Sequence, residues 1–248
     1  DTALIHLCCS FIAIPFCLAL GLPPAESWPY LAASVLIHIG YYFALAQAYH
    51  HGEIGLTYPL MRGVAPLMVA IGALAFIDGA SMSLLGWTGV ALICLGVLIL
   101  GMSAGLLHHR RAIFFALLNS AIIALYTLID AKGVRTSGNA AQYIAALFAF
   151  DGWAFAFWVL YLRRGRAISY FKERWAVGLG GAAASVSSYA IALWAMTVAP
   201  VAAVAALRET SVLFAVLFGT WFLKEKLTRR RAFSVVIIIT GAAALRLA

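Results

Sequence analysis

Charged side chains are scarce in this sequence. Only 10% of its 248 residues are Asp, Glu, Lys or Arg, and 65% are hydrophobic, whereas ordinary soluble domains contain roughly 25% charged residues. No long polar segment separates the apolar stretches. The composition therefore excludes an ordinary soluble domain, and it predicts one polytopic membrane domain without a separate extramembrane enzyme module.

The motifs of several enzyme classes are also missing. Histidines do not occur at metal-ligand spacing on one helix face, and neither a nucleophile motif nor a phosphate-binding glycine loop is present. The cysteines lie inside apolar stretches without ligand-like spacing, so we expect small core or lipid-facing residues. They are Cys8, Cys9, Cys17 and Cys94. These absences argue against a membrane-embedded enzyme, and we predict no metal and no cofactor.

Apolar stretches of about 20 residues, the length that crosses a ~30 Å hydrocarbon core, recur along the chain. In lipid only helices or closed barrels satisfy the backbone, and the alternation of barrel strands is absent, so we expect about nine helices. The predicted spans are Leu4–Leu20, Trp28–Tyr49, Gly55–Ile77, Leu84–Ala104, Ala112–Asp130, Gln142–Leu162, Trp175–Val198, Val201–Leu223 and Ala232–Leu247. The first begins without the basic region and cleavage site of a signal peptide, so insertion is expected to depend on the helices themselves.

Two segments of the chain are near-repeats of one another. Tyr58–Leu100 and Ala205–Leu245 each contain an apolar helix with an arginine near its start, a short polar turn, and a second apolar helix with a glycine late in its length. The paired positions are Arg62 with Arg208 and Gly96 with Gly241. A repeated helix pair with an intramembrane arginine in each copy is typical of transporters built from two related halves.

Basic residues are concentrated in a few turns. The runs His108–Arg111, Arg163–Arg174 and Lys224–Arg231 lie on one side of the membrane if the predicted spans alternate in direction. The positive-inside rule assigns that side to the cytoplasm and the C-terminus to the outside. The alternative reading of such runs is a patch for lipid headgroups or nucleic acid, and we expect no nucleic-acid partner.

The motifs RG-x-APL at Arg62–Leu67 and LRETSVLF at Leu207–Phe214, followed by LKEKLTRRRAFSVVIIITG, resemble the two EamA domains of the drug/metabolite transporter superfamily. The resemblance covers essentially the whole chain. It implies an all-α membrane fold of ten helices in two inverted five-helix repeats around a central cavity. This sequence has about nine, and we interpret the first helix as removed or omitted. The repeats are then residues 1–105 and 106–248. The resemblance also implies that both termini are cytoplasmic, which conflicts with the charge rule, and the charge asymmetry favours the latter.

Arginines at membrane depth are the first candidates for a solute site, because a charge there is costly unless it faces a partner or water. Arg62 and Arg208 occupy equivalent places in the two repeats. The guanidinium group is suited to a carboxylate or phosphate, which predicts an anionic group on the solute or an acidic partner inside the protein. The alternative is that each arginine extends to the interface or bonds nearby carbonyls.

Carboxylates at membrane depth are candidates for proton coupling. Glu209 and Asp151 lie within predicted spans, and a buried carboxyl group takes up and releases protons near neutral pH. Glu209 follows Arg208 directly, so the two side chains point about 100° apart and need not pair. The alternative role of each carboxylate is to satisfy a neighbouring arginine, hydroxyl or backbone group. Asp130 lies at the end of its span, where we expect it at the membrane interface.

Aromatic and hydroxyl side chains complete the predicted solute site. His38 and Tyr42 share one helical face, and Tyr42 has a repeat counterpart in Tyr189, with Ser188 on the same side. The set also includes Tyr58, at the start of the first repeated segment. Such a stripe also occurs in ordinary helix packing and in interfacial belts, and a lone His38 is also typical of a hydrogen-bonded core histidine.

Three classes of function compete. We predict a secondary transporter that exports a small metabolite, amino acid or drug-like solute by alternating access. The first alternative is a flippase for a lipid-linked intermediate, which a cavity opening sideways between helices would distinguish. A membrane-embedded enzyme is disfavoured by the missing motifs. We expect a multi-pass protein of the cell membrane, in a bacterial inner membrane, as a monomer or homodimer, whose partners are the lipid bilayer and an anionic or zwitterionic solute.

Overall fold

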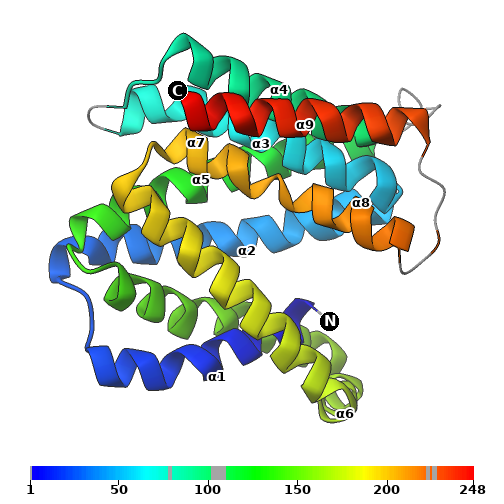
Figure 1. Cartoon of the computed structure of the whole chain (residues 1–248). Helices are drawn as coiled ribbons and strands as arrows, with labels where there is room; N and C mark the ends of the chain where they lie inside the picture. Colours follow the sequence, from blue (N-terminus) through cyan, green and yellow to red (C-terminus); the bar gives the residue numbers. More distant parts are fainter. Residues whose placement is uncertain (1, 78–79, 102–109, 222–223, 225–227) are drawn as a thin grey trace. The chain divides into compact units, whose positions relative to one another are not determined.

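The computed structural model describes residues 2–77, 80–101, 110–221, 224 and 228–248. Within these ranges the chain is helical and contains no strand (Figure 1). The elements are α1 (Thr2–Leu20), η1 (Ala25–Ser27), α2 (Trp28–His51), α3 (Ile54–Phe76), α4 (Leu84–Gly101), α5 (Arg110–Thr136), α6 (Ala140–Val198), α7 (Val201–Arg208), α8 (Ser211–Trp221) and α9 (Arg229–Leu247). The all-α fold expected from the sequence is confirmed.

Eight segments of the described chain are long and apolar enough to cross a membrane. They correspond to the first eight predicted spans, except that the end of Leu84–Ala104 and the end of Val201–Leu223 fall outside the described residues. The ninth predicted span, Ala232–Leu247, is helical within α9 but is not among the eight. The reason is charge, because α9 begins with three consecutive arginines and carries another near its end.

Two predicted spans, Gln142–Leu162 and Trp175–Val198, lie in one continuous helix. Helix α6 has 59 residues, so it would be about 90 Å long if straight. Its first arm runs opposite to α1: the Gln142 amide donates to the Leu20 carbonyl at 2.8 Å, and further along, the Gly152 N–H donates to the Ser10 hydroxyl at 3.2 Å.

The second arm of α6 runs in the same direction as α1. Gly178 lies against Leu4, and Ala182 further on accepts a weak hydrogen bond from the Cys9 thiol. The chain therefore reverses between the arms, as Figure 1 shows, at the basic segment Arg163–Arg174. We expected a turn there. The backbone instead stays helical, because the segment contains no proline and four of its residues are arginines, which favour helix.

The predicted span Val201–Leu223 is interrupted in its middle. Helix α7 ends at Arg208 and α8 begins at Ser211, and the bonds between them run from residue i+3 to residue i: the N–H of Glu209 donates to Ala206 and that of Thr210 to Leu207. Such tightening within a longer helix is found at functional hinges. The sequence pattern alone predicted one uninterrupted helix here.

Helix α3, which belongs to the first predicted repeat, also has an irregular backbone hydrogen-bond pattern near its arginine. Helix α3 contains Pro59 and Pro66 in its interior, on either side of Arg62. Pro66 has no N–H to give to the carbonyl of Arg62, so one rung of the helical ladder is missing at that residue. In both predicted repeats, the helix that carries the arginine is therefore irregular close to that arginine.

The chain divides into two compact units. Unit 1 comprises Asp1–Tyr42 and Ile129–Val198, and unit 2 comprises Phe43–Leu128 and Ala199–Ala248. Each unit combines parts of both predicted repeats, so the units do not follow the repeat boundary. The division into repeats at residues 1–105 and 106–248 describes sequence relationship and stays a prediction.

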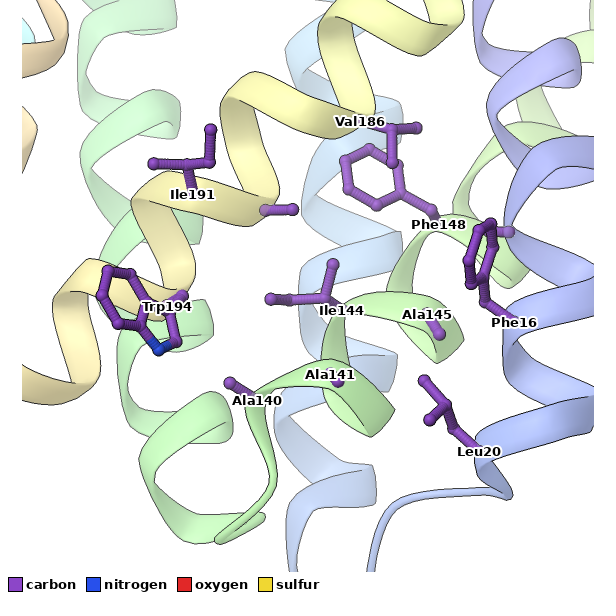
Figure 2. Close-up of a pocket in the computed structure, with 12 residues that line it drawn as sticks. Phe16, Leu20, Ala140, Ala141, Ile144, Ala145, Phe148, Val186, Ile191 and Trp194 are labelled. Carbon is purple, nitrogen blue, oxygen red and sulfur yellow. The ribbon is translucent and has the colours of Figure 1, made fainter.

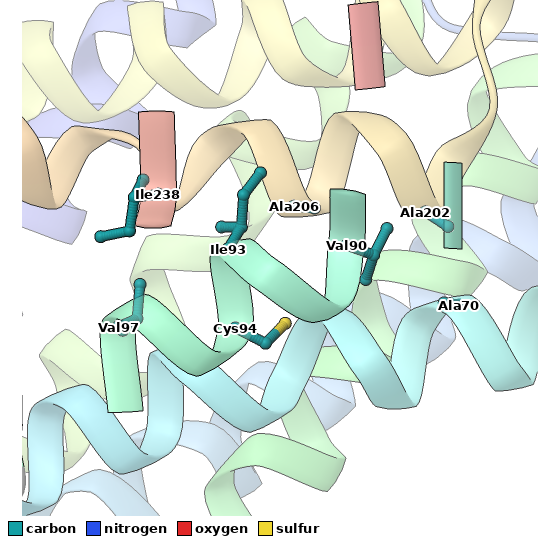
Figure 3. Close-up of a cluster of buried hydrophobic side chains, with 8 residues drawn as sticks. All are labelled: Ala70, Val90, Ile93, Cys94, Val97, Ala202, Ala206 and Ile238. Carbon is teal, nitrogen blue, oxygen red and sulfur yellow. The ribbon is translucent and has the colours of Figure 1, made fainter. Parts of the chain in front are cut away.

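The core of unit 2 is built around α4. Val90, Ile93, Cys94 and Val97 of this helix are almost completely buried. Figure 3 shows them with Ala70 of α3, Ala202 and Ala206 of α7, and Ile238 of α9. Between membrane helices, close van der Waals packing of this kind replaces the hydrophobic effect as the source of cohesion. All four cysteines are buried and unbridged, which agrees with the expectation that they are core residues.

Helices α4 and α9 cross at two glycines with matching surroundings. A Cβ atom at Gly241 would lie 2.8 Å from the Gly89 carbonyl oxygen and 2.9 Å from Ile93 Cγ1; one at Gly96 would lie 3.0 Å from the Ser234 carbonyl oxygen and 2.5 Å from Ile238 Cγ1. The residues in each pair, Gly96 with Gly241, Ile93 with Ile238 and Gly89 with Ser234, are separated by 145 positions. Exchanging the two helices therefore maps one contact onto the other. The antiparallel pair of α4 and α9 thus has a local two-fold axis, which runs perpendicular to the helix axes.

Candidate functional site

In unit 2, the structure brings together two of the predicted site residues. Arg62 Nε of α3 is 2.8 Å from Glu209 Oε2, at the junction of α7 and α8. The two side chains are 19% and 5% exposed. Charge attraction therefore acts between the two groups at short distance. The Arg62 guanidinium also lies 6.0 Å from the centre of the Tyr58 ring, a distance typical of a cation–π contact.

Glu209 has two cations in its surroundings. Both Arg62 and Arg208 act on its carboxylate. Among the described residues of unit 2, the other carboxylate belongs to Glu53, which is exposed at the start of α3. Arg62 and Arg208 therefore both act on this buried anion, and guanidinium groups of this kind are suited to bind a carboxylate or a phosphate.

In unit 1, a second predicted carboxylate is surrounded by polar rings. The Tyr42 hydroxyl donates to Asp151 Oδ2 at 2.8 Å, and His6 Nδ1 lies 3.3 Å from the same oxygen. His38 Nδ1 lies 3.5 Å from Oδ1. The Tyr42 oxygen is also 2.8 Å from His6 Nδ1, and Phe155 stacks on the Tyr42 ring. Asp151 is 6% exposed, so its negative charge is compensated by neighbours from α1 and α2 rather than by water.

Asp130 is placed differently from its prediction. We expected it at the membrane interface, but it is fully buried in unit 1. The Tyr143 hydroxyl donates to its Oδ1 at 3.0 Å and the Tyr189 hydroxyl to its Oδ2 at 2.6 Å. The expectation was wrong because α5 continues beyond Asp130 to Thr136, and because both arms of α6 bring a tyrosine to the carboxylate. Tyr189, predicted to line a solute cavity, uses its hydroxyl here.

Several residues of these clusters were not found from the sequence. His6, Ser34 and Tyr143 were not candidates, although each is a polar residue in an apolar span. That signal was available for His6 and Ser34, but a single sequence does not say which polar residues meet. The remaining candidate, Ser188, is exposed on α6.

The described pockets of unit 1 are lined by other residues than the predicted site residues. Figure 2 shows a pocket of about 400 Å³ between α1 and the two arms of α6, with an apolar lining that includes Phe16, Ile144, Phe148 and Trp194. A second pocket, of about 590 Å³, includes Arg135 in its lining. None of the predicted site residues lines either pocket. Groups of His, Cys, Asp and Glu able to hold a metal ion are absent from the part of the chain that the structure describes.

Comparisons with known proteins agree with the helical architecture. The sequence model of the EamA-like transporter family matches residues 110–247, which is more than half of the chain. No curated protein matches the sequence. One solved crystal structure superposes with a TM-score of 0.77 at 18% identity, over 99% of this chain and 87% of that chain. At this identity, the likeness shows the fold alone.

Proposed function

The chain belongs to the EamA-like transporter family, and we propose from this premise that it is a secondary transporter that exports a small anionic or zwitterionic solute by alternating access. The family makes it a multi-pass membrane transporter, and a bacterial inner membrane is the location we propose. The observation that carries the solute class is the buried Arg62–Glu209 pair, beside which a second cation, Arg208, also acts on the carboxylate.

In this proposal, the solute anion competes with Glu209 for the arginine. Leaving either member of a buried ion pair alone costs about 3–5 kcal/mol. A carboxylate or phosphate on the solute removes that cost, because it takes the place of Glu209 against the planar guanidinium. Binding then releases Glu209, and the released carboxylate becomes available to a proton. Arg62, Arg208 and Tyr58 are the proposed solute contacts in unit 2.

The backbone at this pair supports a moving element. The junction after Arg208 keeps its hydrogen bonds in a tighter pattern, and Pro66, which has no N–H, lies one helical turn after Arg62. Broken helices near the middle of the membrane are where many secondary transporters bind their solute. The matching contacts at Gly96 and Gly241 support an inverted repeat, whose two halves would move about one axis in the membrane plane.

The coupling ion in this proposal is the proton. Glu209 in unit 2 and Asp151 in unit 1 are the proposed proton sites, since both are buried and both face groups that compensate their charge. His38 and Tyr42 belong to the Asp151 site rather than to the solute site, because their polar atoms face that carboxylate.

The test is transport into liposomes that contain the purified full chain. Labelled amino acids, organic anions and organic cations are compared with and without a pH gradient. We expect anionic or zwitterionic solutes to move and cations not to move. Preferential movement of cations would contradict the proposal, and movement of a lipid-linked probe alone would favour a flippase.

Variants of Arg208 make the test specific. Arg208→Ala should abolish transport, because alanine has neither the charge nor the N–H donors. Arg208→Lys should leave an intermediate rate, because lysine keeps the charge but lacks the planar set of N–H donors of the guanidinium group. Arg246→Ala is the matched control, since this arginine is exposed near the end of α9. Normal transport by both Arg208 variants, at normal insertion and folding, would refute the assigned role.

A further inference from the structure

Two adjoining pockets of unit 1 differ in the chemistry of their linings. The pocket in Figure 2 is lined by twelve residues of α1 and α6, all of them alanine, valine, leucine, isoleucine, phenylalanine or tryptophan. The lining of the second pocket includes three polar residues, which are Arg135, Asn139 and Thr197. Both linings contain Ala140, Ala141 and Trp194, so the pockets meet at these residues. A ligand that extends across both therefore needs an apolar part and a polar part.

The polar pocket lies at a surface of the membrane. Two of the segments that are able to cross the membrane, Arg110–Thr136 and Ala140–Arg163, are joined there by residues 137–139. Because a span ends where the hydrocarbon core ends, Arg135 and Asn139 lie at the level of the lipid headgroups. Trp194, in the linings of both pockets, is 58% exposed. Tryptophan is typical of this level, because its ring is apolar and its N–H is polar.

The apolar pocket extends from the headgroup level into the hydrocarbon region. Its lining on the first arm of α6 runs from Ala140 to Phe148, which is roughly 12 Å along a helix. Figure 2 shows Phe16 and Leu20 of α1 on one side of this arm and Trp194 of the second arm on the other. The volume of about 400 Å³ lies within the range of ligand sites, roughly 300–1,000 Å³. A hydrocarbon chain that enters from the headgroup level matches this length and polarity.

Arg135 supplies the charge of the polar pocket. Its Nε–H donates to the Met196 carbonyl oxygen at 2.8 Å, near the end of α6. A carbonyl is neutral, so this bond orients the guanidinium plane and does not cancel its charge. None of the lining residues carries a carboxylate. Helix α6 also begins in this lining, at Ala140, and the N-terminal end of a helix is partially positive. A planar guanidinium in such surroundings is suited to bind a phosphate.

We propose that the two pockets together bind an anionic phospholipid, with one acyl chain in the apolar pocket and the phosphate against Arg135. Basic pockets between membrane helices bind anionic headgroups. A zwitterionic lipid binds less tightly, because its ammonium group meets no carboxylate in this lining. The site consists of residues of unit 1 and shares none with the proposed solute contacts of unit 2. It is therefore a second binding site, which does not depend on the proposed function.

The experiment is native mass spectrometry of the purified full chain. Detergent-solubilised protein is titrated with phosphatidylglycerol or with phosphatidylcholine of the same acyl chains, and each spectrum reports the bound lipids and the oligomeric state. We expect the wild type to retain phosphatidylglycerol more tightly. Arg135→Gln should weaken its binding about fivefold, the effect of one basic residue near a headgroup, and remove the preference. Arg246→Gln is the matched control, because it removes the same charge from an exposed arginine of unit 2.

A second pair of variants tests the apolar pocket. Ala190→Phe places a ring in the pocket, where it competes with the acyl chain. Ala184→Phe is the matched control, because this exposed alanine is on the same arm of α6 and outside the lining. We expect Ala190→Phe to weaken the binding of both lipids and Ala184→Phe to weaken neither. Arg135→Lys keeps the charge and should keep the preference for phosphatidylglycerol, which separates loss of charge from loss of the contact with Met196.

Each part of the proposal has a result that overturns it. Equal binding of the two lipids by the wild type, or unchanged binding by Arg135→Gln, would overturn the phosphate contact. Loss of the preference in Arg135→Lys as well would show that the arginine has a structural role only. Unchanged binding by Ala190→Phe would overturn the acyl-chain pocket. A wild-type dimer that Ala190→Phe converts to monomers would show that a second copy of the chain occupies the pocket instead. The assay contains no solute, so its failure is separate from a failure of the transport assay.

Discussion

The glycines at which α4 and α9 cross provide a quantitative test of the repeat. Gly241→Ala would place a methyl carbon 2.9 Å from Ile93 Cγ1, roughly 0.6 Å inside the favourable carbon–carbon distance of about 3.5 Å. The Gly89 carbonyl oxygen, at 2.8 Å, belongs to the backbone and cannot rotate away. The helices must therefore separate by a few tenths of an ångström.

Overpacking of this kind costs about 1–3 kcal/mol, whereas alanine gains up to about 1 kcal/mol over glycine in helix propensity. We expect a net loss of up to about 2 kcal/mol in the free energy of unfolding for Gly241→Ala. Gly96→Ala should lose a similar amount, because its surroundings, Ser234 and Ile238, are the repeat counterparts of Gly89 and Ile93.

The assay is unfolding in mixed micelles of increasing SDS content, followed by circular dichroism. Gly180→Ala on α6 is the control, since a Cβ there meets no atom within 4 Å and only the propensity gain remains. The reasoning fails if Gly241→Ala is as stable as the control. It also fails if the Gly96 and Gly241 variants change stability in opposite directions, because the local two-fold relation requires matched costs.

Three further predictions concern the other sites. Arg62→Met and Glu209→Gln should each destabilise the protein by about 3–5 kcal/mol, and the double variant by less than the sum; additive losses by thermal unfolding would disprove the pairing. Gly152→Ala should disturb α1 at His6 and reduce transport, since its Cβ would meet the His6 carbonyl oxygen; wild-type transport would show that α1 adapts. The positive-inside rule places the C-terminus outside; a C-terminal fusion that is inactive as a phosphatase and fluorescent as a cytoplasmic reporter would show the opposite.

The sequence predicted the helices better than their ends. Hydropathy located the spans because length and apolar content decide what crosses a bilayer. Hydropathy does not distinguish a polar turn between two helices from a polar segment that stays helical while the chain changes direction. We therefore expected a turn at Arg163–Arg174, but helix α6 continues through this segment. Hydropathy also does not report a change from α to a tighter helical pattern, so the junction at Glu209 was missed.

The charged residues of the site were predictable one by one, but their partners were not. The cost of a charge in lipid is a property of a single residue, and it identified Arg62, Glu209 and Asp151. The pairing of Arg62 with Glu209 joins residues far apart in sequence and depends on helix packing. Asp130 was misplaced for a related reason, since the two tyrosines that bury it come from different arms of α6.

The two arginines of the predicted repeats differ in the residue that follows each of them. The prediction pairs Arg62 with Arg208, but the residue after Arg208 is Glu209, whereas the residue after Arg62 is Gly63. A Cβ at Gly63 would lie 2.8 Å from Leu98 Cγ and 3.2 Å from the Cys94 carbonyl oxygen, so the packing of α3 on α4 leaves no room there for a carboxylate.

Because the first repeat has no acid beside its arginine, Arg62 takes its counter-charge from the second. The ion pair therefore ties one predicted repeat to the other at the place where both helices are irregular. Movement of one repeat against the other must either break this pair or carry it along. Breaking it is costly unless an anion replaces Glu209 or a proton neutralises it. In the mechanism that we propose, solute binding and proton binding at this one carboxylate link transport to conformational change.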